Sequence, residues 1–227
     1  MEIIVIALLI AFFGYMALMI IIAILSTDWG RGLFVILLLV MAISKMVDDA
    51  GKTRKIQEGI DQGRALQEEG LRKAKQIAET GVTVSVNYDL STAEAVLAGK
   101  YDGVDPTITD ENFPATRQGK AEVYIIPVLF NDPSLFPTIK DVIAELVKRN
   151  LRPAELPELL AFGARFPDIQ RGYSVAGLGT MSRQQDGSKR VCFLWATTTR
   201  RYIGLEKIND KSRWYRNTLF VAVKLAN

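Results

Sequence analysis

The chain has 227 residues, of which 49% are hydrophobic and 23% are charged, and its formal net charge is +3. It contains no histidine, which excludes Ser-His-Asp and Cys-His catalysis, histidine phosphorelay and every histidine-ligated metal site. Its single cysteine, Cys192, excludes an intrachain disulfide and a cysteine-cluster zinc site. The composition therefore removes most familiar enzyme chemistries.

Residues 1–47 differ from the rest of the chain, because they carry few charges and long apolar runs. The run from Ile3 to Leu25 contains 23 residues and no charge, which at about 1.5 Å per residue is enough to cross a hydrocarbon core. A polar turn at Ser26–Gly32 precedes a second apolar run, Leu33–Ser44, which is short for a membrane span. We predict a transmembrane helical hairpin over residues 1–47. One span followed by a re-entrant or interfacial helix is the alternative.

Lysine and arginine are unevenly placed around the second apolar run. The turn before it offers only Arg31, whereas Lys45, Lys52, Arg54 and Lys55 follow it. By the positive-inside rule, this distribution places both termini in the cytoplasm. We therefore expect a protein of the inner (plasma) membrane, with the lipid bilayer as a partner.

Residues 48–80 alternate charges densely and contain no proline, which is typical of a helix with a solvated face. The sequence from Glu58 onward aligns with the sequence from Glu69 onward, a repeat of 11 residues. We predict an amphipathic helical stalk with one apolar stripe. The stripe consists of Ile56, Ile60, Gly63, Leu66, Gly70, Leu71, Ala74, Ile77 and Ala78.

Three glycines, Gly59, Gly63 and Gly70, lie on or beside this stripe. Each costs a helix about 1 kcal/mol relative to alanine, so a close neighbour is expected there. Two partners fit the stripe equally well: the chain's own C-terminal domain, or other stalks in a homo-oligomer. Lying flat on the bilayer is a weaker alternative, because the polar face is as acidic as it is basic.

Residues 81–227 follow the pattern of an α+β domain with a mostly antiparallel sheet and two or three helices. Alternation of β-branched residues predicts a strand at Val82–Tyr88, and a capping box at Ser91–Glu94 predicts a helix that Gly99 ends. Further helices are predicted at residues 138–149 and after Pro157. Further strands are predicted at residues 121–130, 173–181, 190–198, 202–206 and 218–225.

Several stretches of this domain form a recognisable set: Ala98–Asp105, Asn112–Pro114, Leu151–Gly163, Phe166–Gln170 and Leu178–Gly179. They resemble a C-terminal domain of uncharacterised bacterial proteins, whose chains end in an aromatic-Leu-Ala-Val-Arg-like strand. The corresponding end here, Phe220–Lys224, departs from that pattern in two positions. The resemblance covers about residues 82–227 and implies a fold, with no activity and no functional residues.

No catalytic motif is recognisable in the sequence. The acidic residues Asp102, Asp105, Asp110 and Glu111 are the candidate for a hard metal ion, but they do not match an EF-hand loop and suit turns instead. Cys192 lies in an apolar run and is expected to be a buried core thiol. We therefore expect no enzyme, no metal and no cofactor, and a hydrolase that uses carboxylates alone is the remaining catalytic alternative.

Charge is divided unevenly within the domain: residues 81–168 carry eight Lys/Arg and thirteen Asp/Glu, whereas residues 169–227 carry eleven and three. The basic part interleaves cations with aromatic rings, so we predict a surface for anionic lipid or for an acidic protein surface. Nucleic acid is disfavoured because no RNA-binding motif accompanies these residues. Solvated turn residues with the tryptophan in the core are the alternative. The predicted surface consists of Arg200, Arg201, Lys211, Arg213, Trp214, Tyr215 and Arg216.

These features together predict a non-enzymatic, membrane-anchored scaffold or adaptor that self-associates and presents an α+β domain to the cytoplasm. The opposite charges of the two parts of the domain suit head-to-tail contact between identical subunits. A membrane-tethered module that senses a ligand or binds nucleic acid is the alternative function.

Overall fold

The computed structural model describes residues 14–19, 21, 29–130, 137–183, 188–209, 211–215 and 217–225. These residues belong to two compact units, residues 1–60 and residues 61–227. The helix α2, Trp29–Thr80, contributes residues to both units. The predicted span Ile3–Leu25 lies largely outside the described residues, which include only residues 14–19 and 21 of it, all helical.

In the first unit, the predicted polar turn at Ser26–Gly32 is corrected, because α2 begins at Trp29. The two glycines, Gly30 and Gly32, cost a helix about 1 kcal/mol each. That is too little to end a helix that the following residues strongly favour. No helix in the described part of the chain is both long and apolar enough to cross a membrane.

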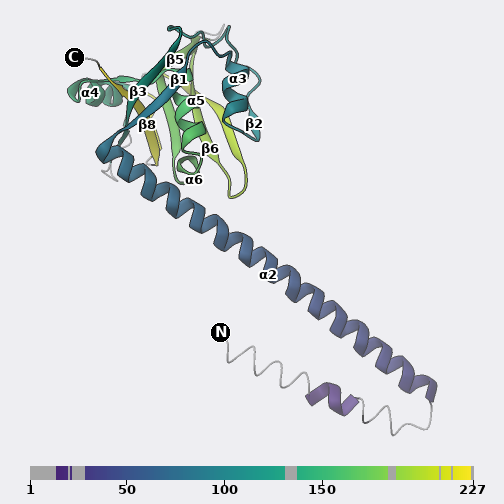
Figure 1. The fold of residues 1–227 in the computed structure, drawn as a ribbon. Coiled ribbons are helices and arrows are strands. Elements are labelled where there is room, and N and C mark those ends of the chain that lie inside the picture. The colour runs from purple at the N-terminus through teal and green to yellow at the C-terminus, as the bar shows by residue number, and fades with distance from the viewer. Residues whose placement is uncertain are drawn as a thin grey trace. The chain divides into compact units, whose positions relative to one another are not determined.

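The second unit is built on one eight-stranded sheet (Figure 1). Its strands are β1 (Val82–Asn87), β2 (Gly103–Val104), β3 (Lys120–Leu129), β4 (Leu151–Pro153), β5 (Ser174–Arg183), β6 (Lys189–Ala196), β7 (Arg201–Ile208) and β8 (Thr218–Lys224). The strand order is β1-β3-β8-β5-β6-β7-β2, and β4 pairs with β8 beside this path. Neighbouring strands are antiparallel except for the parallel pairs β5–β8 and β2–β7. The predicted α+β class with a mostly antiparallel sheet is thus confirmed.

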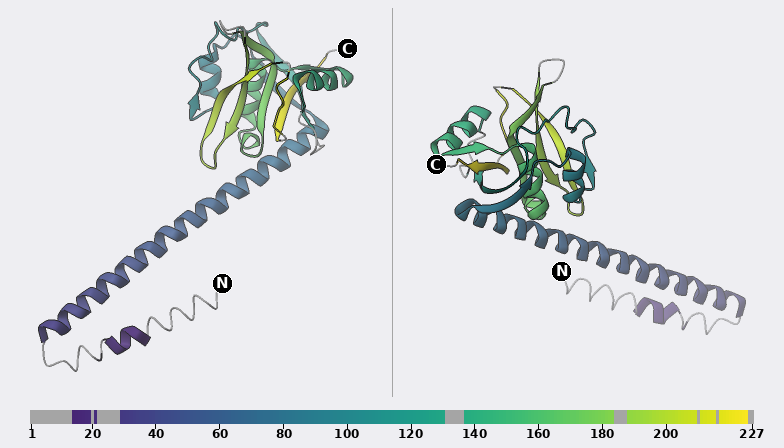
Figure 2. Two further views of the ribbon diagram at one scale, coloured as in Figure 1. Left: turned by 180° about the vertical axis from the view of Figure 1, so that it is seen from behind. Right: turned by 45° about the horizontal axis from the view of Figure 1, so that its top comes forward.

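Four shorter helices accompany the sheet: α3 (Thr92–Ala98), α4 (Ile139–Lys148), α5 (Leu156–Arg165) and α6 (Ile169–Gly172). Ser91 begins α3 through the predicted capping box with Glu94, and Gly99 is its C-cap. Strands β2 and β4 and helix α6 were not predicted, because segments of two to four residues are too short to show periodicity. The helix α3 lies at the β2 side of the sheet and α4 lies at the other side, near the C-terminus (Figure 1, Figure 2).

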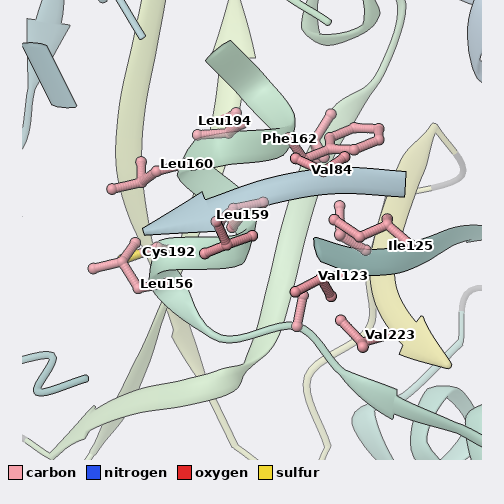
Figure 3. Close-up of a cluster of buried hydrophobic side chains, with 14 of the residues drawn as sticks. Val84, Val123, Ile125, Leu156, Leu159, Leu160, Phe162, Cys192, Leu194 and Val223 are labelled. Atoms are coloured by element: carbon pink, nitrogen blue, oxygen red, sulfur yellow. The ribbon is translucent and has the colours of Figure 1, made fainter. Parts of the chain in front are cut away.

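The central strand β8 is buried on both of its faces. Leu219, Val221 and Val223 join a core cluster that contains the buried residues of α5, which we call the α5 face (Figure 3). Phe220 and Ala222 join a second cluster that contains the buried residues of α4, which we call the α4 face. This alternation follows from the period of two along a strand, and it requires cover on both sides of the sheet.

The last turns of α2 are part of the α5 face. Ala74 and Ile77 are buried in that cluster. Leu71 lies directly against Gly172 at the end of α6. The predicted long helix over residues 48–80 is thus confirmed. Gly63, Gly70, Ala74 and Ile77 of the predicted stripe are buried on the chain's own domain, whereas Leu66 is exposed.

The glycines of the stripe lie where α2 approaches the domain most closely. A Cβ atom at Gly70 would collide with the backbone carbonyl of Asp168, and one at Gly63 would collide with the side chain of Thr198. Next to Gly70, Lys73 Nζ lies 3.2 Å from Asp168 Oδ2. These two glycines are therefore explained by the close neighbour that the sequence analysis expected.

Gly59→Ala and Gly70→Ala form a matched pair of substitutions in this helix. No atom lies within 4 Å of a Cβ at Gly59, so Gly59→Ala improves helix propensity and leaves the domain unchanged. Gly70→Ala forces α2 away from Asp168, and overpacking of this kind lowers the melting temperature of such a domain by about 3–8 °C. Thermal unfolding followed by tryptophan fluorescence gives the melting temperature of each variant. The same melting temperature for both variants would contradict the docking of α2.

Candidate functional site

The residues predicted to form one basic surface are divided between two ends of a strand. Arg200 and Arg201 stand at the start of β7, whereas Lys211 and Arg213 follow its end. A strand of this length spans roughly 25 Å, so the two groups lie far apart on the domain. Arg216 lies outside the described residues. The predicted basic surface is corrected in its membership, because Arg201 and Trp214 are buried.

The side chain of Arg201 is only 7% exposed. Its guanidinium donates to the carbonyl oxygens of Gly99 at 2.6 Å and Gly163 at 2.7 Å, and to Gln170 Oε1 at 2.9 Å. It also lies over the ring of Tyr101, 4.6 Å from the centroid. Burial lowers the pKa of Arg201. This cation ties α3, α5 and α6 to β7 and is closed to an outside partner.

Trp214 is also internal, with 5% of its surface exposed. Its ring packs edge to face on Phe220 of the α4 face, with 5.3 Å between the centroids. The alternative prediction, which put this tryptophan in the core, is thus confirmed. The flanking residues of the predicted set are exposed: Lys211, Arg213 and Tyr215.

A cavity of about 240 Å³ lies beside this segment on the α4 face. The sheet contributes Ser174, Phe193, Glu206, Ile208 and Thr218 to its walls, and the loop after β7 contributes residues 212–215. The sheet residues come from four strands and were not predicted, because no spacing in the sequence connects them. The structure therefore joins three residues of the predicted basic surface to partners that only the fold brings near.

The loop that closes the cavity is held by its own hydrogen bonds. The Asn209 amide donates to Ser212 Oγ at 2.8 Å, and the Lys211 amide donates to Asn209 Oδ1 at 2.8 Å. The Trp214 amide donates to the carbonyl oxygen of Pro137 at 3.0 Å, which fixes the loop to the segment before α4. This wall of the cavity is therefore formed before any ligand binds.

Two polar atoms of the cavity residues are buried without a hydrogen-bond partner in the described part of the chain. They are Trp214 Nε1 and Thr218 Oγ1. An unsatisfied buried donor costs about 1–3 kcal/mol, and most such atoms in folded proteins bond to protein, ordered water or a ligand. The cavity thus has an apolar wall that also carries the charged residues Glu206 and Arg213, while the two unpartnered atoms are buried in the protein.

A second polar cluster lies at the start of α5, around Glu158, which is completely buried. Its carboxylate accepts hydrogen bonds from Arg152 at 2.5 and 2.9 Å, from the Tyr88 hydroxyl at 2.6 Å and from the Glu155 amide at 2.8 Å. Desolvation acts to raise the pKa of Glu158, but the bonds from Arg152 and Tyr88 outweigh it and the pKa is lowered. Burial and the bond to Glu158 raise the pKa of Tyr88 to about 12. This cluster joins β1, β4 and α5 as a structural ion pair.

The neighbouring carboxylate, Glu155, is also engaged. It accepts from Thr116 Oγ1 at 2.7 Å and lies 3.5 Å from Arg117 Nε. Two carboxylates that are each bound by cations and hydroxyls suit a structural role better than proton transfer to a substrate.

The acidic residues near β2 are used in turns. Asp105 Oδ1 accepts from the amide and hydroxyl of Thr107, and Asp110 Oδ1 accepts from the amide and hydroxyl of Thr92. Within the ranges that the structure describes, no group of three or more His, Cys, Asp or Glu residues is placed to hold a metal. Cys192 is buried on the α5 face, as predicted, and burial raises the pKa of its thiol.

Comparison of the chain with protein-family models, curated proteins and solved structures finds no match. The resemblance of residues 82–227 to a C-terminal domain of bacterial proteins therefore stays a prediction.

The Glu158 cluster gives a test of stability by single and double substitution. Glu158→Leu leaves the Arg152 guanidinium without its carboxylate, and we expect a loss of about 3–5 kcal/mol in the free energy of unfolding. Arg152→Met combined with Glu158→Leu removes both charges and should recover most of that loss. Urea unfolding gives the free energy of unfolding of both variants. If the double variant is as unstable as the single one, the unpaired charge of Arg152 does not cause the loss in the free energy of unfolding.

The same cluster predicts a pH dependence. Because folding lowers the pKa of Glu158, its stabilising contribution is present above the unfolded pKa of about 4.3 and is lost as pH falls through the folded value. The natural protein should therefore lose stability below about pH 4 more steeply than the Arg152→Met, Glu158→Leu variant. If the free energy of unfolding falls equally steeply with pH in the two proteins, Glu158 is not ionised in the folded protein.

Proposed function

We propose that the chain is a non-enzymatic, membrane-anchored scaffold that self-associates through α2 and presents its α+β domain to the cytoplasm. The observation that carries this proposal is the part of the apolar stripe of α2 that stays exposed when the end of the helix docks on the domain. Ile56, Ile60 and Leu66 are 64%, 42% and 38% exposed in a single copy of the chain. The bilayer is the proposed partner of residues 1–47, and a second copy is the proposed partner of the stripe.

The proposed anchor is supported by the apolar character of α2 before residue 48. Leu37, Leu38, Val40 and Met41 are exposed, at 57%, 49%, 55% and 61%. Together with the exposed Met46 and Val47, they point to all sides of the helix when placed at 100° per residue. A helix that is apolar all round is typical of one that lies within a membrane or a larger core.

The proposed self-association is supported by the contrast between two faces of α2 after residue 48. The polar face carries exposed pairs one turn apart, such as Arg54 Nε to Glu58 Oε1 at 2.9 Å. Exposed pairs of this kind contribute little to stability, and they indicate a solvated face. Ile56, Ile60 and Leu66 lie within about 120° of arc when spaced at 100° per residue. Burying this stripe between parallel copies removes apolar area from water without placing a charge in the interface.

A second candidate function, a membrane-tethered module that binds a small ligand, is supported by the cavity beside Trp214. The observation in its favour is a cavity of about 240 Å³ whose wall includes Phe193, Ile208 and Trp214. The two functions are compatible, because the stripe and the cavity share no residue.

The scaffold proposal is tested by separating anchoring from self-association. Replacing Ile56, Ile60 and Leu66 together by Asp should leave the protein in the membrane fraction but reduce the detergent-extracted particle to a monomer. Deleting residues 1–47 should release the protein from the membrane and leave the oligomer. Light scattering coupled to size exclusion gives the particle mass, and sedimentation gives the membrane fraction. A triple variant with an unchanged mass would overturn self-association through this stripe, and membrane retention of the deletion would overturn the anchor.

A further inference from the structure

We propose that the outer edge of β1 binds an extended peptide segment of another protein, which joins the sheet as a further strand. Apolar side chains of the segment enter a groove beside β1, and a carboxylate of the segment meets Arg165. The inference goes beyond the scaffold proposal and the cavity beside Trp214, because it uses the residues of neither.

The edge of the sheet at β1 carries backbone groups without partners. β1 ends the strand order and pairs with β3 alone among the described strands. The Tyr88 amide donates to the carbonyl oxygen of Gly119 at 2.9 Å, in register with the β1–β3 ladder. Because bonded and non-bonded residue pairs alternate along antiparallel strands, the amides and carbonyls of Thr83, Ser85 and Asn87 face away from β3. None of these groups bonds to another residue that the structure describes.

This edge lacks the features by which proteins protect the edges of their sheets. Native edge strands are often very short, bulged, or rich in lysine or proline. The six residues of β1 include neither lysine nor proline, and they pair with β3 residue for residue without a bulge. The opposite edge of the sheet is β2, which has only two residues. β1 is therefore the edge at which a further strand can be added.

A groove of about 310 Å³ lies at the same edge. Its walls include Ser85 and Asn87, two of the residues whose backbone groups face outward. Residues of α3 and α5 supply most of the remaining wall, and α5 itself packs against β1 (Figure 3). Four of the lining residues are alanines, which leave room for larger side chains. Every second side chain of an added strand points to the α5 side of the sheet, where this groove lies.

The groove also has a charge that selects the segment. Among the described residues that line it, Arg165 at the end of α5 is the charged one. Its side chain is exposed and forms no ion pair with a residue that the structure describes. A guanidinium pairs with a carboxylate through two parallel hydrogen bonds. The segment therefore carries an aspartate, a glutamate or a C-terminal carboxylate beside its apolar residues.

The β1 strand of a second copy fits this edge less well than a peptide does. Its inward side chains, Val84 and Val86, are 2% and 1% exposed, because their own domain covers them. They cannot enter the groove of another copy at the same time. A peptide without a domain of its own brings both the backbone groups and uncovered apolar side chains.

The test uses the full chain in detergent and a phage-displayed library of random eight-residue peptides. Selected peptides are synthesised with a fluorophore, and fluorescence anisotropy gives their Kd. We expect peptides that have apolar residues at every second position and at least one aspartate or glutamate. Their Kd should be about 100 μM or tighter.

Alternate N-methylation of the best peptide tests strand addition itself. One variant carries methyl groups on the amides of its odd residues, and the other carries them on its even residues. Only one of these two sets faces β1. One variant should therefore bind at least about tenfold more weakly than the parent peptide, and the other should bind nearly as well.

Substitutions at the edge and in the groove locate the binding. Ser85→Pro removes an outward amide but no bond to β3, so it should weaken binding at least about tenfold with little change in melting temperature. Ser85→Ala is its matched control and should bind like the natural protein. Ala164→Leu fills the groove and should also weaken binding at least about tenfold. Leu97→Ala is the control for it, because Leu97 is an exposed residue of α3 that does not line the groove.

Arg165→Glu tests the charge of the groove. It should weaken the binding of an acidic peptide. Changing the acidic residue of that peptide to lysine should then restore binding, because the two charges are exchanged.

Four outcomes would overturn the proposal. These are no enriched peptide, equal binding of the two N-methylated variants, equal binding to Ser85→Pro and Ser85→Ala, and a lower particle mass for Ser85→Pro, which would mean that a second copy occupies the edge. If Ser85→Pro does not fold, the two N-methylated peptides decide. None of these outcomes decides self-association through the α2 stripe, since no stripe residue lines the groove or belongs to β1.

Discussion

The burial of β8 on both of its faces is the constraint on which the rest of the domain depends. Val221 points into the α5 face and Phe220 into the α4 face, and both side chains are almost fully buried. A strand of this kind requires cover on each side of the sheet. The helices α5 and α6 supply part of the cover on the first side, and the last turns of α2 complete it through Ala74 and Ile77. The end of α2 is therefore a component of the core rather than a free linker.

The second side of the sheet is covered by a helix and a loop. The helix α4 covers part of the α4 face through Val142 and Leu146, and the loop after β7 adds Trp214. A cavity of about 240 Å³ lies between this loop and the strands. The charged residues Glu206 and Arg213 line that space.

The sequence predicts what depends on local pattern and misses what depends on tertiary contact. Alternation and capping residues predict the longer strands and the start of α3, because these signals lie within a few neighbouring residues. The burial of Arg201 could not be predicted, because its acceptors at Gly99 and Gly163 come from other elements. The apolar stripe predicts a covered face of α2, but the periodicity that reveals the face does not identify its partner. The same holds for Glu206 and Thr218, which line one cavity although β5 and β6 lie between their strands.

Amide hydrogen exchange along α2 tests most directly whether the end of this helix belongs to the core of the domain. The amides of residues 65–78 should exchange as slowly as those of β8, because both are released only when the whole domain unfolds. Gly70→Ala should accelerate exchange in residues 65–78 before it affects β8, since it weakens the docked helix first. Exchange of residues 65–78 that is orders of magnitude faster than that of β8 in the natural protein would contradict this account.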